Sequence, residues 1–249
     1  MLIGDGIFRI MDILHDDGTG FVLITNGYLL DEKIVKKLKK YRFFWVQVSI
    51  DGSDSSFHDA FRCKVGSWEK AVRAAVMVSS AGLPLTIASS VTPQNIDKIE
   101  DMADLAYSLG ASTIILGEIM VSGRSYKNRD ILLSQEESAK MKQIIKKLET
   151  RYLDKMTVQT SATDVYQLNY SKTHPNSTAI IRPNGDVRLD CVAPFIGGNV
   201  LKQDFVEIWN NKLKNVWENS AVSKYAEDMT RMSDFDMDII NHVDDDIEL

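Results

Sequence analysis

The sequence predicts an α/β protein: a partial (β/α) TIM-like barrel with parallel strands, followed by a small C-terminal α+β hairpin extension. Three observations lead to this prediction. Helical and strand-like segments alternate along the first half of the chain with short connections between them. The strand-like segments are mostly continuous apolar runs, as in parallel strands that helices cover on both faces. Several of these runs also end in small polar residues, where ligands bind in such folds.

The expected helices have apolar residues at helical spacing. The first ends at Asp17-Gly18, and the second begins near Asp31, whose carboxylate can cap it. The third spans 67–81, and the fourth begins near Gln94. A fifth opens with the capping-box sequence Ser-Gln-Glu-Glu at 134–137. The lysine-rich face of the second helix is interpreted as a solvated surface.

Four apolar runs between these helices are the expected strands. They occupy residues 21–25, 45–50, 85–91 and 112–116. Strands that alternate with helices in this order are typical of a parallel α/β sheet, here a curved sheet or partial barrel.

The pattern changes after Tyr152, because residues 153–177 are polar and weakly periodic. Two apolar runs then flank Pro183-Asn184-Gly185-Asp186, which predicts a β-hairpin. Asp204 is a candidate cap for a short helix. We therefore expect three parts: a barrel over 1–150, an extension over 151–225 and an acidic tail over 226–249.

Composition limits the function. With 249 residues and a net charge of −6, the chain has no broad basic face for nucleic acid. No apolar run is long enough to cross a bilayer and no secretory signal is recognisable, so a cytoplasmic location is expected. Cys63 and Cys191 are the only cysteines in the sequence. Two cysteines exclude a disulfide framework, an all-cysteine zinc site and an iron–sulfur cluster built from this chain alone.

Polar residues follow three neighbouring strands and predict one shared pocket. They occur in Thr25-Asn26-Gly27, in Ser49-Ile50-Asp51-Gly52 and in the segment Ser89-Ser90-Val91-Thr92-Pro93. The alternative for Ser49 and Asp51 is a turn that their side chains order locally.

These residues resemble the radical S-adenosylmethionine (SAM) superfamily, in particular its branch with a C-terminal SPASM or twitch extension. Asn26, the Ser-Ile-Asp-Gly sequence from Ser49, and His-Asp-Ala-Phe-Arg at 58–62 are similar to the family's third and fourth strand ends and the following loop. Arg-Pro-Asn-Gly-Asp-Val-Arg-Leu-Asp-Cys at 182–191 looks like its extension hairpin. The resemblance covers roughly residues 1–125 and 178–215.

The resemblance implies that the pocket binds SAM. Ser49 would hydrogen-bond the amino-acid end of SAM, and Arg62 would pair with its carboxylate through a planar fork. Ser89 or Ser90 would reach the ribose, and the segment at Met120 and Val121 would meet the adenine. Arg62 as a plain surface arginine is the alternative.

The departures from the family matter as much. Its Cys-x-x-x-Cys-x-x-Cys motif, which holds a [4Fe–4S] cluster, is absent. By this resemblance the chain begins after the second barrel strand, so the cluster ligands would belong to a full-length parent only, and this chain alone should not cleave SAM. A barrel lacking its first strands exposes a sheet edge, so we expect self-association or a covering segment.

Three functions remain open. The first is the C-terminal portion of a radical SAM enzyme, such as a peptide maturase, that modifies a peptide or protein. The second is a non-catalytic module derived from that family that binds a peptide or another partner. The third, an unrelated barrel enzyme acting on a phosphorylated metabolite, is the weakest, because no glycine-rich phosphate loop follows a late strand.

Overall fold

The computed structural model describes residues 6–119, 124–161, 164–174, 177–189, 191, 193–231 and 246–249. The chain divides into two compact units. The first unit comprises Met1–Ile119 and Leu133–Ser161, and the second comprises Met120–Leu132 and Ala162–Leu249. Each is described here by itself. Among the described residues, no helix has the length and apolarity that a bilayer span requires.

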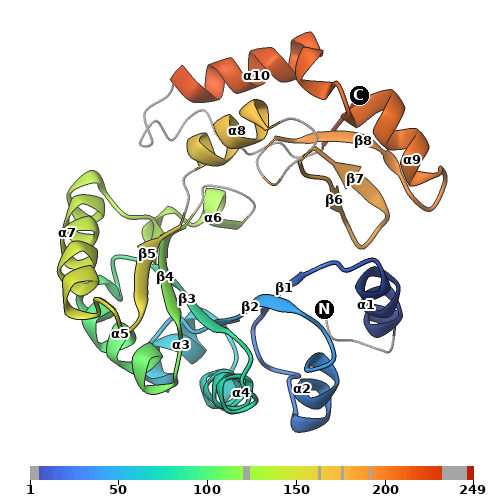
Figure 1. Ribbon diagram of the computed structural model, residues 1–249. Helices are drawn as coiled ribbons and strands as arrows, with labels where there is room; N and C mark the ends of the chain where they lie inside the picture. Colours follow the sequence, from blue (N-terminus) through green and yellow to red (C-terminus); the bar gives the residue numbers. More distant parts are fainter. Residues whose placement is uncertain are drawn as a thin grey trace. The chain divides into compact units, whose positions relative to one another are not determined.

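The first unit is built on a parallel sheet with the strand order β1-β2-β3-β4-β5 (Figure 1). Its strands are β1 (Phe21–Thr25), β2 (Phe43–Ser49), β3 (Leu85–Val91), β4 (Thr113–Glu118) and β5 (Thr157–Thr160). Spatial order follows chain order, as in a section of a (β/α) barrel, and this confirms the predicted α/β class. β5 lies within the polar segment that sequence periodicity left unassigned.

Two of the helices of the first unit begin at the capping residues that the sequence predicts. The helices of this unit are α1 (Gly6–Asp16), α2 (Glu32–Leu38), α3 (Ser55–Phe61), α4 (Ser67–Ser80), η1 (Ile96–Lys98), α5 (Ile99–Ser108) and α7 (Gln135–Arg151). Asp31 caps α2 by accepting a hydrogen bond from the Ile34 amide at 2.8 Å. Ser134 and Glu137 form a complete capping box on α7.

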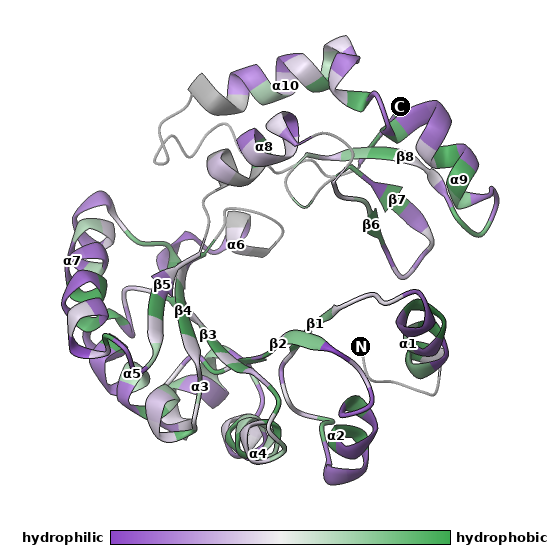
Figure 2. Cartoon of the chain, in the orientation of Figure 1, coloured by the Kyte–Doolittle hydropathy of each residue, from purple (hydrophilic) through white to green (hydrophobic). Residues whose placement is uncertain are grey.

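The expectation that helices cover both faces of this sheet is wrong for the first unit. α4, α5 and α7 contact the strands from one side, and α2 packs on α4 (Figure 1). Burial therefore differs between residues of β2: Val46 and Val48 are fully buried, whereas the preceding Trp45 is 40% exposed. The strands nonetheless are apolar along much of their length (Figure 2), which is why the sequence suggested two covered faces. Within the described residues of the first unit, no helix covers the other face, which is the concave one expected of a partial barrel (Figure 1).

The second unit contains a four-stranded sheet with the order β6-β7-β8-β9. Its elements are α6 (Arg124–Lys127), η2 (Arg129–Ile131), α8 (Asp164–Thr173), β6 (Ile180–Ile181), β7 (Asp186–Arg188), β8 (Phe195–Asn199), α9 (Phe205–Ile208), η3 (Trp209–Leu213), η4 (Val216–Glu218), α10 (Ser220–Arg231) and β9 (Ile247–Glu248). The predicted hairpin is β6–β7, with Gly185 at a φ of +90° in its turn. The predicted small α+β extension is thus confirmed as a second small sheet with helices.

Candidate functional site

The candidate site is built around Asp51, immediately after β2. Its side chain is fully buried. The carboxylate accepts a hydrogen bond from the Ser90 amide at 3.0 Å and a charge-assisted one from Arg62 Nε. Asp51 therefore joins the end of β2 to the end of β3 and fixes the arginine. Sequence reasoning placed this carboxylate in a ligand pocket, whereas its oxygens are already engaged by the protein.

The chain after Asp51 continues into α3, a helix that the sequence did not predict. Asp54 caps α3 by accepting from the Ser56 amide at 2.9 Å. His58, on the buried side of α3, accepts a hydrogen bond from the Asp51 amide through Nδ1 at 3.1 Å. Burial lowers the pKa of His58, so its imidazole is neutral and can accept that bond. This arrangement brings Arg62, just after α3, back to the end of β2.

Asn95 is a buried member of the site that sequence reasoning missed. Its Nδ2 donates to the backbone carbonyls of Asp51 and Ser90, both at 2.9 Å. Its Oδ1 accepts from the Thr92 amide at 2.7 Å. The Thr-Pro-Gln-Asn sequence after β3 was read only as the start of a helix, and nothing in it signals a side chain that bridges two strand ends.

Two serines of the predicted site lie on the same, uncovered face of the sheet. Ser49 is paired in register with Ala88, and Ser90 lies two residues further along β3. Both are half-buried. Within the described part of the chain, neither hydroxyl makes a hydrogen bond, and the Arg62 terminal nitrogens also remain unengaged. Three sets of donors thus stand at the carboxyl edge of β2 and β3.

Asn26 and Val121, the other two predicted site residues, are not part of this group of donors. Asn26 lies at the same edge, after β1, but it is exposed, and its Oδ1 accepts from the Tyr28 amide at 3.1 Å, which forms a local turn. Val121, the predicted adenine contact, lies outside the described residues. The structure therefore brings Ser49, Arg62 and Ser90 together around Asp51 and gives Asn26 a turn-forming role.

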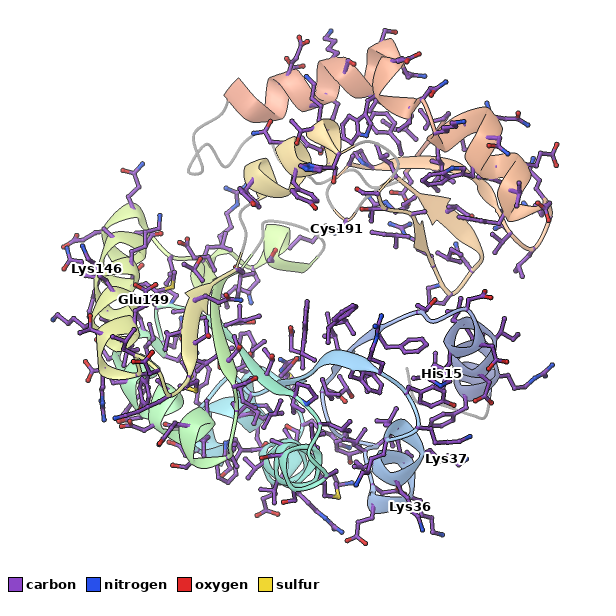
Figure 3. The ribbon with its side chains drawn as sticks, in the orientation of Figure 1. His15, Lys36, Lys37, Lys146, Glu149 and Cys191 are labelled. Carbon is purple, nitrogen blue, oxygen red and sulfur yellow. The ribbon has the colours of Figure 1, made fainter. Side chains whose placement is uncertain are left out.

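The described residues offer no cluster of three or more His, Cys, Asp or Glu side chains that could hold a metal ion. Cys63 is exposed, with a φ of +52°, and Cys191 is exposed in the second unit (Figure 3). Lys36 and Lys37 are exposed on α2 (Figure 3), but Lys37 is not simply solvated, because its Nζ lies 4.9 Å from the centroid of the Phe8 ring on α1.

Comparison with known proteins finds a family match within the first unit. Residues 2–106 match the model of the radical SAM superfamily. An AdoMet-dependent heme synthase of Methanosarcina barkeri is 31% identical over 125 residues, 50% of this chain and 36% of that protein. The mycofactocin maturase MftC of Mycolicibacterium smegmatis is 34% identical over 118 residues, 47% of this chain and 30% of that protein. The chain thus spans about a third of the length of these relatives.

A longer match and two solved structures extend the likeness beyond that domain. The subtilosin biosynthesis protein AlbA of Bacillus subtilis is 25% identical over 218 residues, 86% of this chain and 48% of that protein. The structure of anSMEcpe with bound AdoMet has a TM-score of 0.65 at 17% identity, covering 99% of this chain and 75% of that one. SuiB of Streptococcus suis bound to S-adenosylmethionine has a TM-score of 0.65 at 13% identity, with 86% and 53% covered. At these identities, the solved structures support the fold alone.

Proposed function

We propose, from the premise that residues 2–106 form a radical SAM domain, that this chain supplies the SAM-binding portion of a protein that modifies a peptide. Proteins similar to it include the maturase MftC, AlbA and a PqqA peptide cyclase of Granulibacter bethesdensis. SuiB, a structural neighbour, has also been solved bound to its precursor peptide SuiA. A peptide substrate is therefore the class that these likenesses favour.

The observation that carries the proposal is the way Asp51 holds Arg62. Asp51 occupies only the inner Nε of the guanidinium and leaves the terminal nitrogens at the carboxyl edge of the sheet, 34% of the Arg62 side chain being exposed. A carboxylate such as the one on SAM fits this planar fork. The Ser49 hydroxyl would bond the same amino-acid end, and Ser90 would reach the ribose. The donor set therefore fits SAM.

The residues of this chain do not fit a [4Fe–4S] cluster. In this family three cysteines of one short motif hold that cluster, and this chain has two cysteines, Cys63 and Cys191, more than a hundred residues apart in sequence. We assign no step of cluster chemistry to this chain. The cysteine count also favours a second candidate, a non-catalytic module that binds a peptide or another partner.

Calorimetric titration of the chain with SAM tests the proposal. We expect saturable binding that Arg62→Gln weakens about tenfold or more, because a charge-assisted hydrogen bond contributes about 1.5–3 kcal/mol. Arg73→Gln is the matched control, since Arg73 is 71% exposed on α4 and pairs only loosely with Glu32 at 4.0 Å. Equal weakening by both variants would contradict the site.

A second measurement separates the two candidate functions. The SAM-binding portion of an enzyme requires SAM binding, whereas a module that kept only its partner groove does not. Absence of SAM binding in a folded chain that still binds a peptide would therefore favour the module. Anaerobic reconstitution with iron and sulfide checks the cysteine argument, and stoichiometric uptake of a cubane cluster would overturn it.

A further inference from the structure

Residues 246–249 lie along the small sheet of the second unit and include the added strand β9 (Ile247–Glu248). β9 runs parallel to β8, with Ile247 opposite Phe195 and Glu248 opposite Ile196. The Ile247 amide donates to the Pro194 carbonyl at 2.7 Å, and the Leu249 amide donates to the Ile196 carbonyl at 3.0 Å. The edge of β8 thus accepts an extended segment by backbone pairing, which is strand addition.

Two side chains anchor this segment, one acidic and one apolar. Arg182 donates to the Asp246 carboxylate through Nη1, and Arg188 Nη2 lies 3.4 Å from Asp246 Oδ1. The Asp246 side chain is only 13% exposed. Three residues later, Leu249 packs against a buried cluster that includes Phe195.

The two residues between the anchors make no such contacts. Ile247 is 45% exposed, and Glu248 is exposed as well. Lys212 Nζ then donates to the Leu249 carbonyl at 2.8 Å. The contacts therefore define a pattern: an acidic residue, two spacers and an apolar residue, in an extended conformation.

We propose that this groove, formed by Arg182, Arg188, the edge of β8 and Lys212, is a docking site for an acidic extended peptide. Residues 246–249 occupy it in cis, and a peptide with the same pattern competes with them in trans. The proposal concerns the second unit only and does not depend on SAM binding by the first.

Charge complementarity supports a peptide that is acidic rather than merely apolar. Two arginines and a lysine contact the segment, and Asp246 pairs with both arginines. The neighbouring Asp186 carboxylate accepts hydrogen bonds from Asn199 at 2.9 Å and Asn184 at 2.6 Å, and these bonds, with the charges of Arg182 and Lys202, lower its pKa, so it stays charged. Among the described residues, Arg182, Arg188 and Lys212 still outnumber this carboxylate when Asp246 leaves, and the groove keeps an excess of positive charge for an incoming carboxylate.

The cis segment also leaves the groove incompletely satisfied, which makes it displaceable. Arg188 Nε is buried and finds no acceptor among the described residues. A buried donor without a partner is costly, so a ligand that reaches it gains over Asp246. The strand itself is only two residues long. Bound in cis, the segment lowers the apparent affinity of a competing peptide according to the fraction of chains whose groove is open, and occupation of about nine grooves in ten lowers it about tenfold.

Fluorescence anisotropy with a labelled, amidated peptide Asp-Asp-Asp-Ile-Glu-Leu, the sequence of residues 244–249, tests the inference on the full chain. The double variant Asp246→Asn/Leu249→Ser removes both anchors and should bind the peptide at least about tenfold more tightly than the unaltered chain. Glu248→Gln is the matched control, because it removes one charge from the same strand without touching an anchor, and it should not change the affinity. Lys212→Gln in the double variant should weaken binding, whereas Lys224→Gln, on exposed α10, should not.

Two further measurements test whether the peptide must be acidic. A peptide with Lys at the third position should lose about tenfold or more of its affinity, and added salt should weaken the original peptide. Far-UV circular dichroism confirms that the variants are folded. The inference is overturned if a folded double variant binds no better than the unaltered chain, or if the lysine peptide binds equally well. Light scattering that finds a dimer, dissolved by the double variant, would overturn occupation in cis.

Discussion

Replacing Asp51 with asparagine tests the central contact of the first unit. Asparagine has the same shape, and its Oδ1 can still accept from the Ser90 amide. Its amide group, however, would face Arg62 Nε, so that a donor meets a donor where a carboxylate accepted a hydrogen bond. The substitution therefore removes the negative charge with little change in packing volume.

The expected loss of stability follows from the burial of the two partners. Removing one partner of a fully buried pair costs about 3–5 kcal/mol. The Arg62 side chain is 34% exposed and can regain water, so the smaller value for one charge-assisted hydrogen bond applies, about 2–3 kcal/mol. At roughly 2–4 °C per kcal/mol, the melting temperature of the first unit should fall by about 4–12 °C.

Differential scanning calorimetry measures this change, and hydrogen exchange at the β2 and β3 amides locates it in the first unit. Asp101→Asn is the control, because Asp101 forms an exposed pair with Lys98 at 3.2 Å that contributes less than about 1 kcal/mol. A decrease for Asp51→Asn no larger than that of the control would refute the view that Asp51 organises the strand ends.

Three further variants have defined outcomes. Burial lowers the pKa of His58 in the folded chain, so below the ordinary histidine pKa of about 6.5 the unfolded chain binds a proton more readily than the folded chain. The free energy of unfolding should therefore be highest above about pH 6.5 and fall as the pH drops below it. Urea midpoints measured across about pH 5–8 should show this slope, and His58→Gln should remove it. Gly185→Ala should destabilise the second unit by more than about 1 kcal/mol, because the added Cβ would lie 2.7 Å from Asn199 Oδ1 and the residue has a φ of +90°. Gly66→Ala is the control: it has a φ of +76° with no atom near the added Cβ, so calorimetry of this variant measures the cost of the positive φ alone. Cys63→Gly should raise the melting temperature slightly, since it relieves a left-handed residue at a φ of +52°; a decrease would mean that the cysteine side chain has a structural role.

Much of the fold follows from local rules that the sequence carries openly. Asp31, Ser134 and Glu137 cap their helices because side-chain oxygens meet amides that the first turn leaves unpaired. Asn184-Gly185 makes a hairpin because glycine adopts the positive φ that the turn requires. These interactions join residues within a few positions of one another, so a pattern along the chain is enough to predict them.

The elements that escaped prediction depend on distant contacts. α3 has only seven residues and a polar sequence, and its His58 is fixed by the Asp51 amide seven residues away. Asn95 bridges two strand ends, and one of its partners is 44 residues distant. The uncovered face of the sheet can be read from β2 only in part, because Val46-Gln47-Val48-Ser49 alternates in polarity but Phe44 and Trp45 are both aromatic and exposed. No local pattern distinguishes a barrel interior from a face covered by helices.

The candidate site was predictable in position but not in its internal order. Polar residues after parallel strands must meet at one edge, and Ser49 and Ser90 do so. Which group binds a ligand and which one supports it depends on hydrogen bonds that sequence does not specify. Asp51 positions Arg62 and the Ser90 backbone rather than a ligand, because its oxygens already accept hydrogen bonds from them, and Asn26 forms a local turn.

A buried carboxylate–arginine pair is not the cheapest way to join two strand ends, because well-packed apolar residues of similar size are often at least as stabilising. Here Asp51 draws on Arg62, Ser90 and, through its backbone, His58 and Asn95. These are more hydrogen bonds than are needed to join the ends of β2 and β3. Their distinctive consequence is a partly exposed guanidinium that is fixed through Nε, with no hydrogen bond to its other nitrogens from the described residues. Our proposal accounts for this arrangement, because a preorganised fork loses less conformational entropy when it binds a carboxylate than a free surface arginine does.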